Sequence, residues 1–163
     1  MDEALVANWN SVVGLTDTVY LLGDVSFHRT ARTLELLVKL RGFIALIRGN
    51  HDKRLSSEIT ARFMFVKDLY TLQVDDVSVS GKRPGQQDII LCHYALRTWE
   101  KSHYGAWNLY GHSHGNLTDD PHVRAIDVGV DCHNYHPISY EQVKAIMLRK
   151  QVRAIDGQPE ENM

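Results

Sequence analysis

Hydrophobic runs long enough to cross a membrane are absent from this sequence of 163 residues, and cysteine is scarce. No apolar run approaches the roughly 18 residues that span a bilayer, which excludes a membrane-spanning helix. The acidic, amphipathic start MDEALVANWN lacks the pattern of a secretory signal. The two cysteines, Cys92 and Cys132, could pair, but without an export signal we expect two reduced, buried thiols in a cytoplasmic protein.

An excess of positive charge is also absent. The formal net charge is -2, so the chain has no basic surface with which to bind nucleic acid non-specifically. A local positive site, or a bound metal whose charge this count omits, leaves nucleic acid open as a partner. We expect no membrane partner, and the sequence leaves the oligomeric state open.

The chain has the length of one domain with a sizeable core. It contains no internal repeat, no low-complexity tract and no linker before its polar end, QPEENM. We therefore expect a single domain over residues 1–155 and a flexible tail over 156–163.

The first third of the chain has the pattern of a βαβ unit. Apolar residues at helical spacing predict helices over 2–13 and 30–41, and short apolar runs predict buried strands over 18–22 and 43–47. A helix that connects two such strands favours parallel pairing.

The rest of the chain is richer in strands. Residues 69–74 and 77–80 flank Asp75-Asp76 and are predicted to form a hairpin. Ser139, with Gln142 three residues later, predicts a capping box at the start of a helix. The further expected elements are strands over 88–92, 107–111 and 124–130 and a helix over 140–149. The fold class is therefore α/β, a parallel part followed by a strand-rich part.

Four of the apolar runs are followed by residues of metal-binding type. These are Asp24, the segment Asn50-His51-Asp52, His93, and the segment His112-Ser113-His114. In open α/β sheets ligands bind at the carboxyl ends of strands, so these residues could converge on one site. In an extended segment, moreover, side chains at i and i+2, such as those of His112 and His114, point to the same face.

Each of these residues also has a structural interpretation. Asp24 could cap the following helix, Asn50 could occupy a turn, and His93 could be a hydrogen-bonded core histidine. His112 and His114 could face water in a polar turn. Four such placements at four strand ends would require four independent coincidences. A metal site is the better interpretation.

The motifs at the strand ends resemble those of the calcineurin-like metallophosphoesterases. They are GD at 23–24, GNHD at 49–52, a lone histidine at 93 and GHSH at 111–114. The segments HYALRTWEKSHYGAWNLYGHSHG and DVGVD also resemble a branch of small bacterial and phage phosphoesterases. The resemblance covers about residues 1 to 150 and implies a layered fold of mixed β-sheets flanked by helices.

The resemblance implies a role for each motif residue. Asp24 would bridge two metal ions, and His114 would bind the first of them. The second ion would be bound further by Asn50, His93 and His112. His51 would not bind metal and would protonate the leaving oxygen. The resemblance also implies hydrolysis of phosphomonoesters or phosphodiesters by metal-activated hydroxide. The expected metal is Mn²⁺, with Fe²⁺, Zn²⁺, Co²⁺ or Ni²⁺ as alternatives.

A small phosphate ester is the expected substrate, and nucleotides are among the candidates. A nuclease of the same fold and a catalytically impaired metal-binding scaffold are the alternative functions. Loops 81–87 and 95–106 would surround the site. Within them Lys82, Arg83 and Arg97 could contact phosphate or be solvated surface charges.

The chain departs from the family pattern at its start. The family's first strand ends in Asp-x-His, which supplies two ligands of the first metal, and no such strand precedes residue 2. We interpret Met1 as a late start, with genuine absence of the first strand as the alternative. Of the two Asp-x-His triplets elsewhere, Asp120-x-His122 lies in a turn-rich stretch that we interpret as a surface loop, and Asp131-x-His133 matches a different part of the family pattern. With Asp24 and His114 alone, the first ion should bind weakly.

Overall fold

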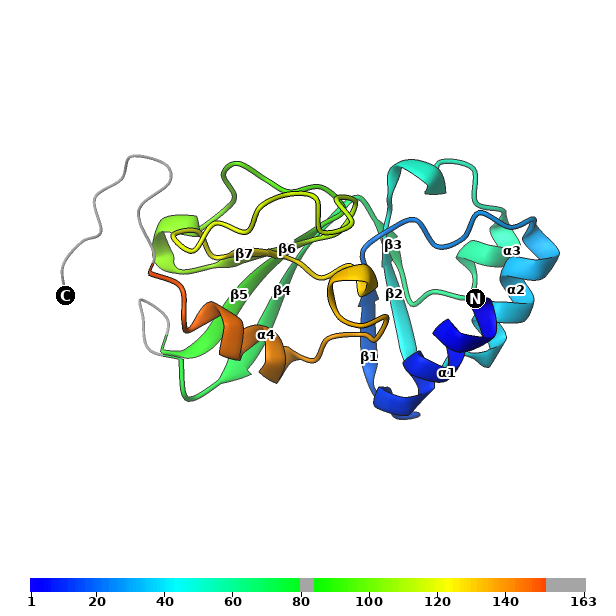
Figure 1. The fold of residues 1–163 in the computed structure, drawn as a ribbon, viewed down its shortest axis with the longest axis horizontal. Coiled ribbons are helices and arrows are strands. Elements are labelled where there is room, and N and C mark those ends of the chain that lie inside the picture. Colours follow the sequence, from blue (N-terminus) through cyan, green and yellow to red (C-terminus); the bar gives the residue numbers. More distant parts are fainter. Residues whose placement is uncertain (80–83, 152–163) are drawn as a thin grey trace.

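The computed structural model describes residues 1–79 and 84–151. The fold is α/β: a three-stranded and a four-stranded sheet lie side by side, with helices flanking them (Figure 1). The expected tail over 156–163 and the side chains of Lys82 and Arg83 lie outside the described residues. In the described part, no helix is both long and apolar enough to cross a membrane.

The first sheet contains the predicted βαβ unit. Its elements are α1 (Asp2–Val12), β1 (Thr18–Leu21), α2 (Thr30–Lys39), β2 (Phe43–Ile47), α3 (Ser57–Thr60) and β3 (Val66–Lys67). The strand order is β1-β2-β3 and both pairings are parallel. The parallel pairing expected from the strand–helix–strand pattern is thus confirmed.

The second sheet is mixed. Its elements are β4 (Leu69–Asp76), β5 (Gly85–Cys92), β6 (Trp107–Tyr110) and β7 (Ala125–Asp127), followed by α4 (Tyr140–Met147). The strand order is β4-β5-β6-β7, with β4 antiparallel to β5 and the other pairings parallel. Helix α4 begins with the predicted capping box of Ser139 and Gln142.

The predicted hairpin of residues 69–74 with 77–80 is wrong. Strand β4 continues through Asp75 and Asp76 and pairs with β5 along its whole length. The carboxylate of Asp76 accepts hydrogen bonds from the backbone and side chain of Ser78 and from the Tyr140 hydroxyl, which fixes a turn after the strand. Val77 is exposed in that turn, whereas Ile89 and Leu91 of β5 are buried. Burial therefore favours β5 as the partner.

Two smaller expectations also fail after β7. The strand predicted over 124–130 ends at Asp127, and a single 3-10 turn, Val130–Cys132, follows it. Cys132 is exposed in that turn, so only Cys92 is the buried thiol that we expected. In a pleated strand, alternate side chains point to opposite faces, and one face would have been buried. Residues 130–132 form a turn instead, so this pattern does not apply to Cys132.

Strand β2 separates two hydrophobic cores. Ile44 and Leu46 pack with Trp9 of α1 and Leu37 of α2 in one cluster. Ile47 belongs to a second cluster, formed with residues of β5, β6, β7 and α4. Because successive side chains of a strand point to opposite faces, one strand serves both cores. The carboxyl end of β2 is consequently anchored on both of its sides.

We expect Leu46→Ala to lower the free energy of unfolding by about 2–5 kcal/mol, because the side chain is fully buried and its removal leaves a cavity. Leu148→Ala is the matched control, since Leu148 is exposed and should change stability by less than about 0.5 kcal/mol. Urea unfolding followed by circular dichroism measures both. Equal losses in the two variants would contradict the assignment of the core.

Candidate metal centre

The carboxyl ends of four strands, two from each sheet, meet at one place. Asp24 follows β1, Asn50 follows β2, His93 follows β5 and His112 follows β6. One ligand atom from each of Asp24, His93 and His112 lies within 4.8 Å of the other two. The side-chain oxygen of Asn50 lies 3.0 Å from Nε2 of His93. The structure therefore brings together four of the five predicted metal ligands.

The orientation of the His93 ring is fixed by a hydrogen bond between the sheets. Nδ1 of His93 lies 2.6 Å from the carbonyl oxygen of Leu22, at the end of β1. A carbonyl oxygen can only accept, so Nδ1 carries the proton and donates it. In the neutral ring, Nε2 then presents an unshared electron pair to the centre. His93 is 2% exposed, so water is excluded from most of the ring.

The groups that face Nε2 of His93 are also rich in electrons. They are the side-chain oxygen of Asn50 at 3.0 Å, Nδ1 of His112 at 3.2 Å and a carboxylate oxygen of Asp24 at 3.6 Å. Lone pairs at these separations repel each other unless a proton or a cation lies between them. A mixed set of imidazole nitrogens and carboxylate and amide oxygens suits Mn²⁺, Fe²⁺, Zn²⁺ or Co²⁺. The donor set therefore fits a divalent cation.

The backbone at the centre is strained in two of the four loops. Asp24 and His112 have φ values of +54° and +66°, in the left-handed region. Residues other than glycine rarely adopt this conformation, and such strain is concentrated at functional sites.

Gly23 is required by close packing as well as by its φ of +90°. A Cβ atom at this position would lie 2.4 Å from Nδ1 of His93 and 2.6 Å from the Cα atom of Gly49. A larger residue would therefore displace His93 from the Leu22 carbonyl.

The buried carboxylate of Asp52 joins the loops after β1 and β2. One oxygen accepts hydrogen bonds from the backbone N–H groups of Asp24 at 2.7 Å and Gly49 at 2.8 Å, and the other from Val25 at 3.0 Å. The sequence groups Asp52 with Asn50 and His51 as a residue of metal-binding type, and the resemblance implies no role for it. An acidic residue three positions after the glycine of a turn at a strand end is the local signal that could have indicated its role in joining the loops.

The fifth predicted ligand, His114, bonds a carboxylate that comes from another loop. Its Nδ1 is 2.5 Å from a carboxylate oxygen of Asp131, and this hydrogen bond raises the pKa of the imidazole above its ordinary value. His114 does not belong to the described group of side chains whose ligand atoms cluster within 4.8 Å. The turn after β7 supplies Asp131, so the spacing of His112 and His114 alone could not show this pairing.

His51 lies beside the centre. Its backbone N–H donates to a carboxylate oxygen of Asp24 at 3.0 Å, and its side chain is exposed. The ring lies 4.9 Å, centroid to centroid, from that of Phe27. His51 thus borders the four side chains and remains accessible to a ligand.

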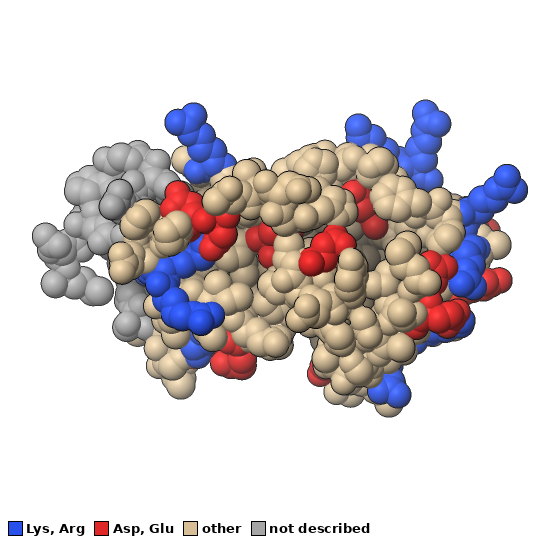
Figure 2. Space-filling model, in the orientation of Figure 1, with Lys and Arg blue, Asp and Glu red and all other residues tan. Residues whose placement is uncertain are grey.

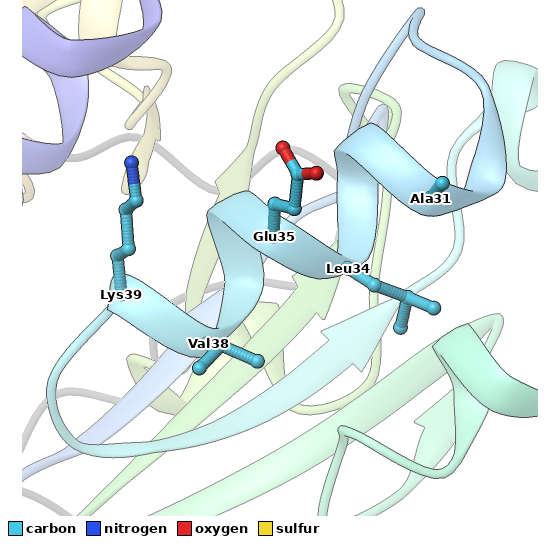
Figure 3. A pocket seen from close by; sticks show the side chains of 5 residues that line it. All are labelled: Ala31, Leu34, Glu35, Val38 and Lys39. Atoms are coloured by element: carbon cyan, nitrogen blue, oxygen red, sulfur yellow. The ribbon is translucent and has the colours of Figure 1, made fainter.

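One hollow elsewhere in the described residues lacks converging polar groups. A shallow depression of about 480 Å³ on α2 is lined by Ala31, Leu34, Glu35, Val38 and Lys39 (Figure 3). All five belong to one helix, and the Glu35 and Lys39 side chains point away from those of Leu34 and Val38.

Lys and Arg side chains form separate groups, with no continuous basic surface, on the face seen in Figure 2.

Comparison with known proteins identifies relatives for nearly the whole chain. The chain is 32% identical to Uncharacterized protein MJ1445 of Methanocaldococcus jannaschii, over 96% of this chain and 81% of the archaeal protein. It belongs to the MJ1445 family. Gene 66 protein of Mycobacterium phage L5 is 28% identical over 80% of this chain and 73% of the phage protein. No protein-family model matches the chain.

A solved structure shares the fold of this MJ1445 relative. The crystal structure of the protein of unknown function AQ665 from Aquifex aeolicus matches with a TM-score of 0.59, over 89% of this chain and 84% of that one. The sequence identity is 19%, so the likeness concerns the fold alone.

We expect Asp52→Asn to lower the free energy of unfolding by about 1–3 kcal/mol, because an amide nitrogen cannot accept a backbone N–H and leaves a buried donor unsatisfied. Asp68→Asn is the matched control, since Asp68 is exposed. Denaturant unfolding compares the two. A loss of stability in Asp68→Asn as large as that in Asp52→Asn would contradict the role of Asp52 in joining the loops.

Proposed function

We propose that this protein is a metal-dependent phosphoesterase of the calcineurin-like type. The arrangement around Nε2 of His93 carries the proposal. A buried nitrogen with an unshared electron pair faces an amide oxygen, a second imidazole and a carboxylate. These are the ligand types that the GD, GNHD and GHSH motifs indicate.

Asp24, Asn50, His93 and His112 would hold the ion. Bound divalent cations of this kind polarise a phosphoryl group and lower the pKa of a coordinated water to near 7. The Leu22 carbonyl and the Asp52 carboxylate would support this function indirectly. The first holds the His93 ring in its tautomer, and the second fixes the backbone of Asp24.

His51 would act as the general acid. Ester hydrolysis leaves an alkoxide that needs a proton, and imidazole is the side chain best suited to donate one near neutral pH. The exposed ring and the backbone contact with Asp24 support this role. In this proposal the imidazole donates its proton to the leaving oxygen.

The finer fold assignment is part of the same proposal. The metallophosphoesterase-like layering would consist of the two sheets, with α1, α2 and α3 on the outer side of the first sheet and α4 against the second (Figure 1). The convergence of two strand ends from each sheet on one centre supports it.

A metal-binding protein without catalysis is the second candidate, and one observation favours it. In the two-metal site of the proposed family, His114 would be a ligand of the first ion. Here its Nδ1 bonds Asp131, which leaves Nε2 available, but among the described residues His114 is not part of the group whose ligand atoms lie within 4.8 Å of one another. A single filled site would bind the phosphoryl group with one ion, where two act as a clamp on both reacting oxygens.

We expect the dialysed protein to retain about one Mn²⁺ per chain, because one group of ligand atoms converges in the described residues. His93→Ala and His112→Ala should each weaken Mn²⁺ binding by at least roughly tenfold, since each removes a ligand. His122→Ala is the matched control, because this ring bonds the Gln151 carbonyl instead. Elemental analysis and calorimetry measure content and affinity. Unaltered Mn²⁺ binding in both ligand variants would refute the site.

We expect Mn²⁺-loaded protein to hydrolyse bis(p-nitrophenyl) phosphate, and His51→Ala to lower kcat by roughly 10²–10⁴ with little change in bound Mn²⁺. The release of p-nitrophenolate reports the rate, and His122→Ala again serves as the control. No turnover of fully loaded protein with Mn²⁺, Fe²⁺, Zn²⁺, Co²⁺ or Ni²⁺ would favour the non-catalytic alternative.

A further inference from the structure

Two exposed aromatic rings contact the histidines of the candidate centre. Phe27 is 77% exposed, and its ring lies 4.9 Å from that of His51, with the planes 66° apart. Tyr94 is 45% exposed, and its ring lies 4.7 Å from His112 and 5.0 Å from His93. One ring thus borders the proposed general acid, and the other borders two of the proposed metal ligands.

The fold does not account for these rings. An exposed apolar side chain is common on protein surfaces and has no meaning by itself. Phe27 and Tyr94, however, both lie beside the one described cluster of potential metal ligands. Among the described residues, neither ring is a member of the three hydrophobic clusters that form the core. Their accessible area is therefore available to a ligand that occupies the centre.

The chemistry of the two rings indicates the kind of ligand. Aromatic side chains stack on planar aromatic groups, and nucleobases are bound in this way with little dependence on their identity. We infer that Phe27 and Tyr94 select phosphate esters whose organic group carries a planar aromatic ring, such as a nucleobase. This inference rests on the proposed phosphoesterase function, which places the phosphate of the ester at the metal centre.

Binding to the Mn²⁺-loaded protein, measured by calorimetry, tests the inference without relying on turnover. AMP and ribose 5-phosphate share a phosphate and a sugar, and only AMP has a base. We expect AMP to bind roughly tenfold more tightly, a difference of about 1.4 kcal/mol. Phenyl phosphate compared with methyl phosphate tests whether a simple aryl ring is sufficient. A preference within either pair supports ring recognition and identifies which kind of ring is recognised.

Variants assign the preference to particular residues. Phe27→Ala and Tyr94→Ala should each reduce the affinity ratio of the aromatic to the non-aromatic ligand several-fold. Phe27→Trp, which keeps an aromatic ring at this position, should retain the ratio of the unaltered protein. Phe43→Ala is the matched control. Phe43 is also exposed, at 55%, but lies at the opposite end of β2 from Asn50. An unaltered ratio in both alanine variants would overturn the assignment to these rings.

The remaining outcomes separate this inference from the proposed function. If each pair of ligands binds equally well to the unaltered protein, the inference on aromatic selection fails and the phosphoesterase proposal stands. If neither these esters nor inorganic phosphate binds to the Mn²⁺-loaded protein, the proposed function fails, and the inference that rests on it fails as well.

Discussion

The hydrogen bond from Nδ1 of His93 to the carbonyl oxygen of Leu22 joins the two sheets, and the arrangement of the centre depends on it. Leu22 follows β1 of the first sheet, and His93 follows β5 of the second. Since the bond is buried, loss of either partner would leave a polar group without its hydrogen bond. It also directs Nε2 of His93 to the other three side chains.

The neighbouring backbone adapts to this bond. Gly23 leaves room for the imidazole, and a Cβ at Gly49 would lie 2.3 Å from a carboxylate oxygen of Asp24 and 2.9 Å from Cε1 of His93. Asp24 and His112 adopt left-handed conformations, and these change the direction of the chain just after β1 and β6. Three N–H groups bound by Asp52 hold two of these loops together. Strain at one position is therefore stabilised by hydrogen bonds at others.

A catalytic site and a purely metal-binding site would use the same metal ligands. The two differ in the residues that they need around those ligands. Catalysis needs an accessible acid beside the centre, the role proposed for His51, and a surface for the organic part of the ester, the role inferred for Phe27 and Tyr94. The position of His114 points the other way, because this histidine, which a second ion would need, is not a member of the described group of ligand atoms. The names of the family members state no activity.

The sequence by itself determined the βαβ unit of the first sheet, without α3 and β3, and the residues that lie at the strand ends. An apolar run, a glycine and a polar residue form a local pattern, and strand alternation and helical spacing are properties of neighbouring residues. Partners distant in the sequence were decided by the tertiary structure. The pairing of β4 with β5, the bond of His93 to Leu22, and the bond of His114 to Asp131 join residues whose spacing carries no signal. Burial and the packing of one sheet against the other select these partners, because only the folded chain brings them within hydrogen-bonding distance.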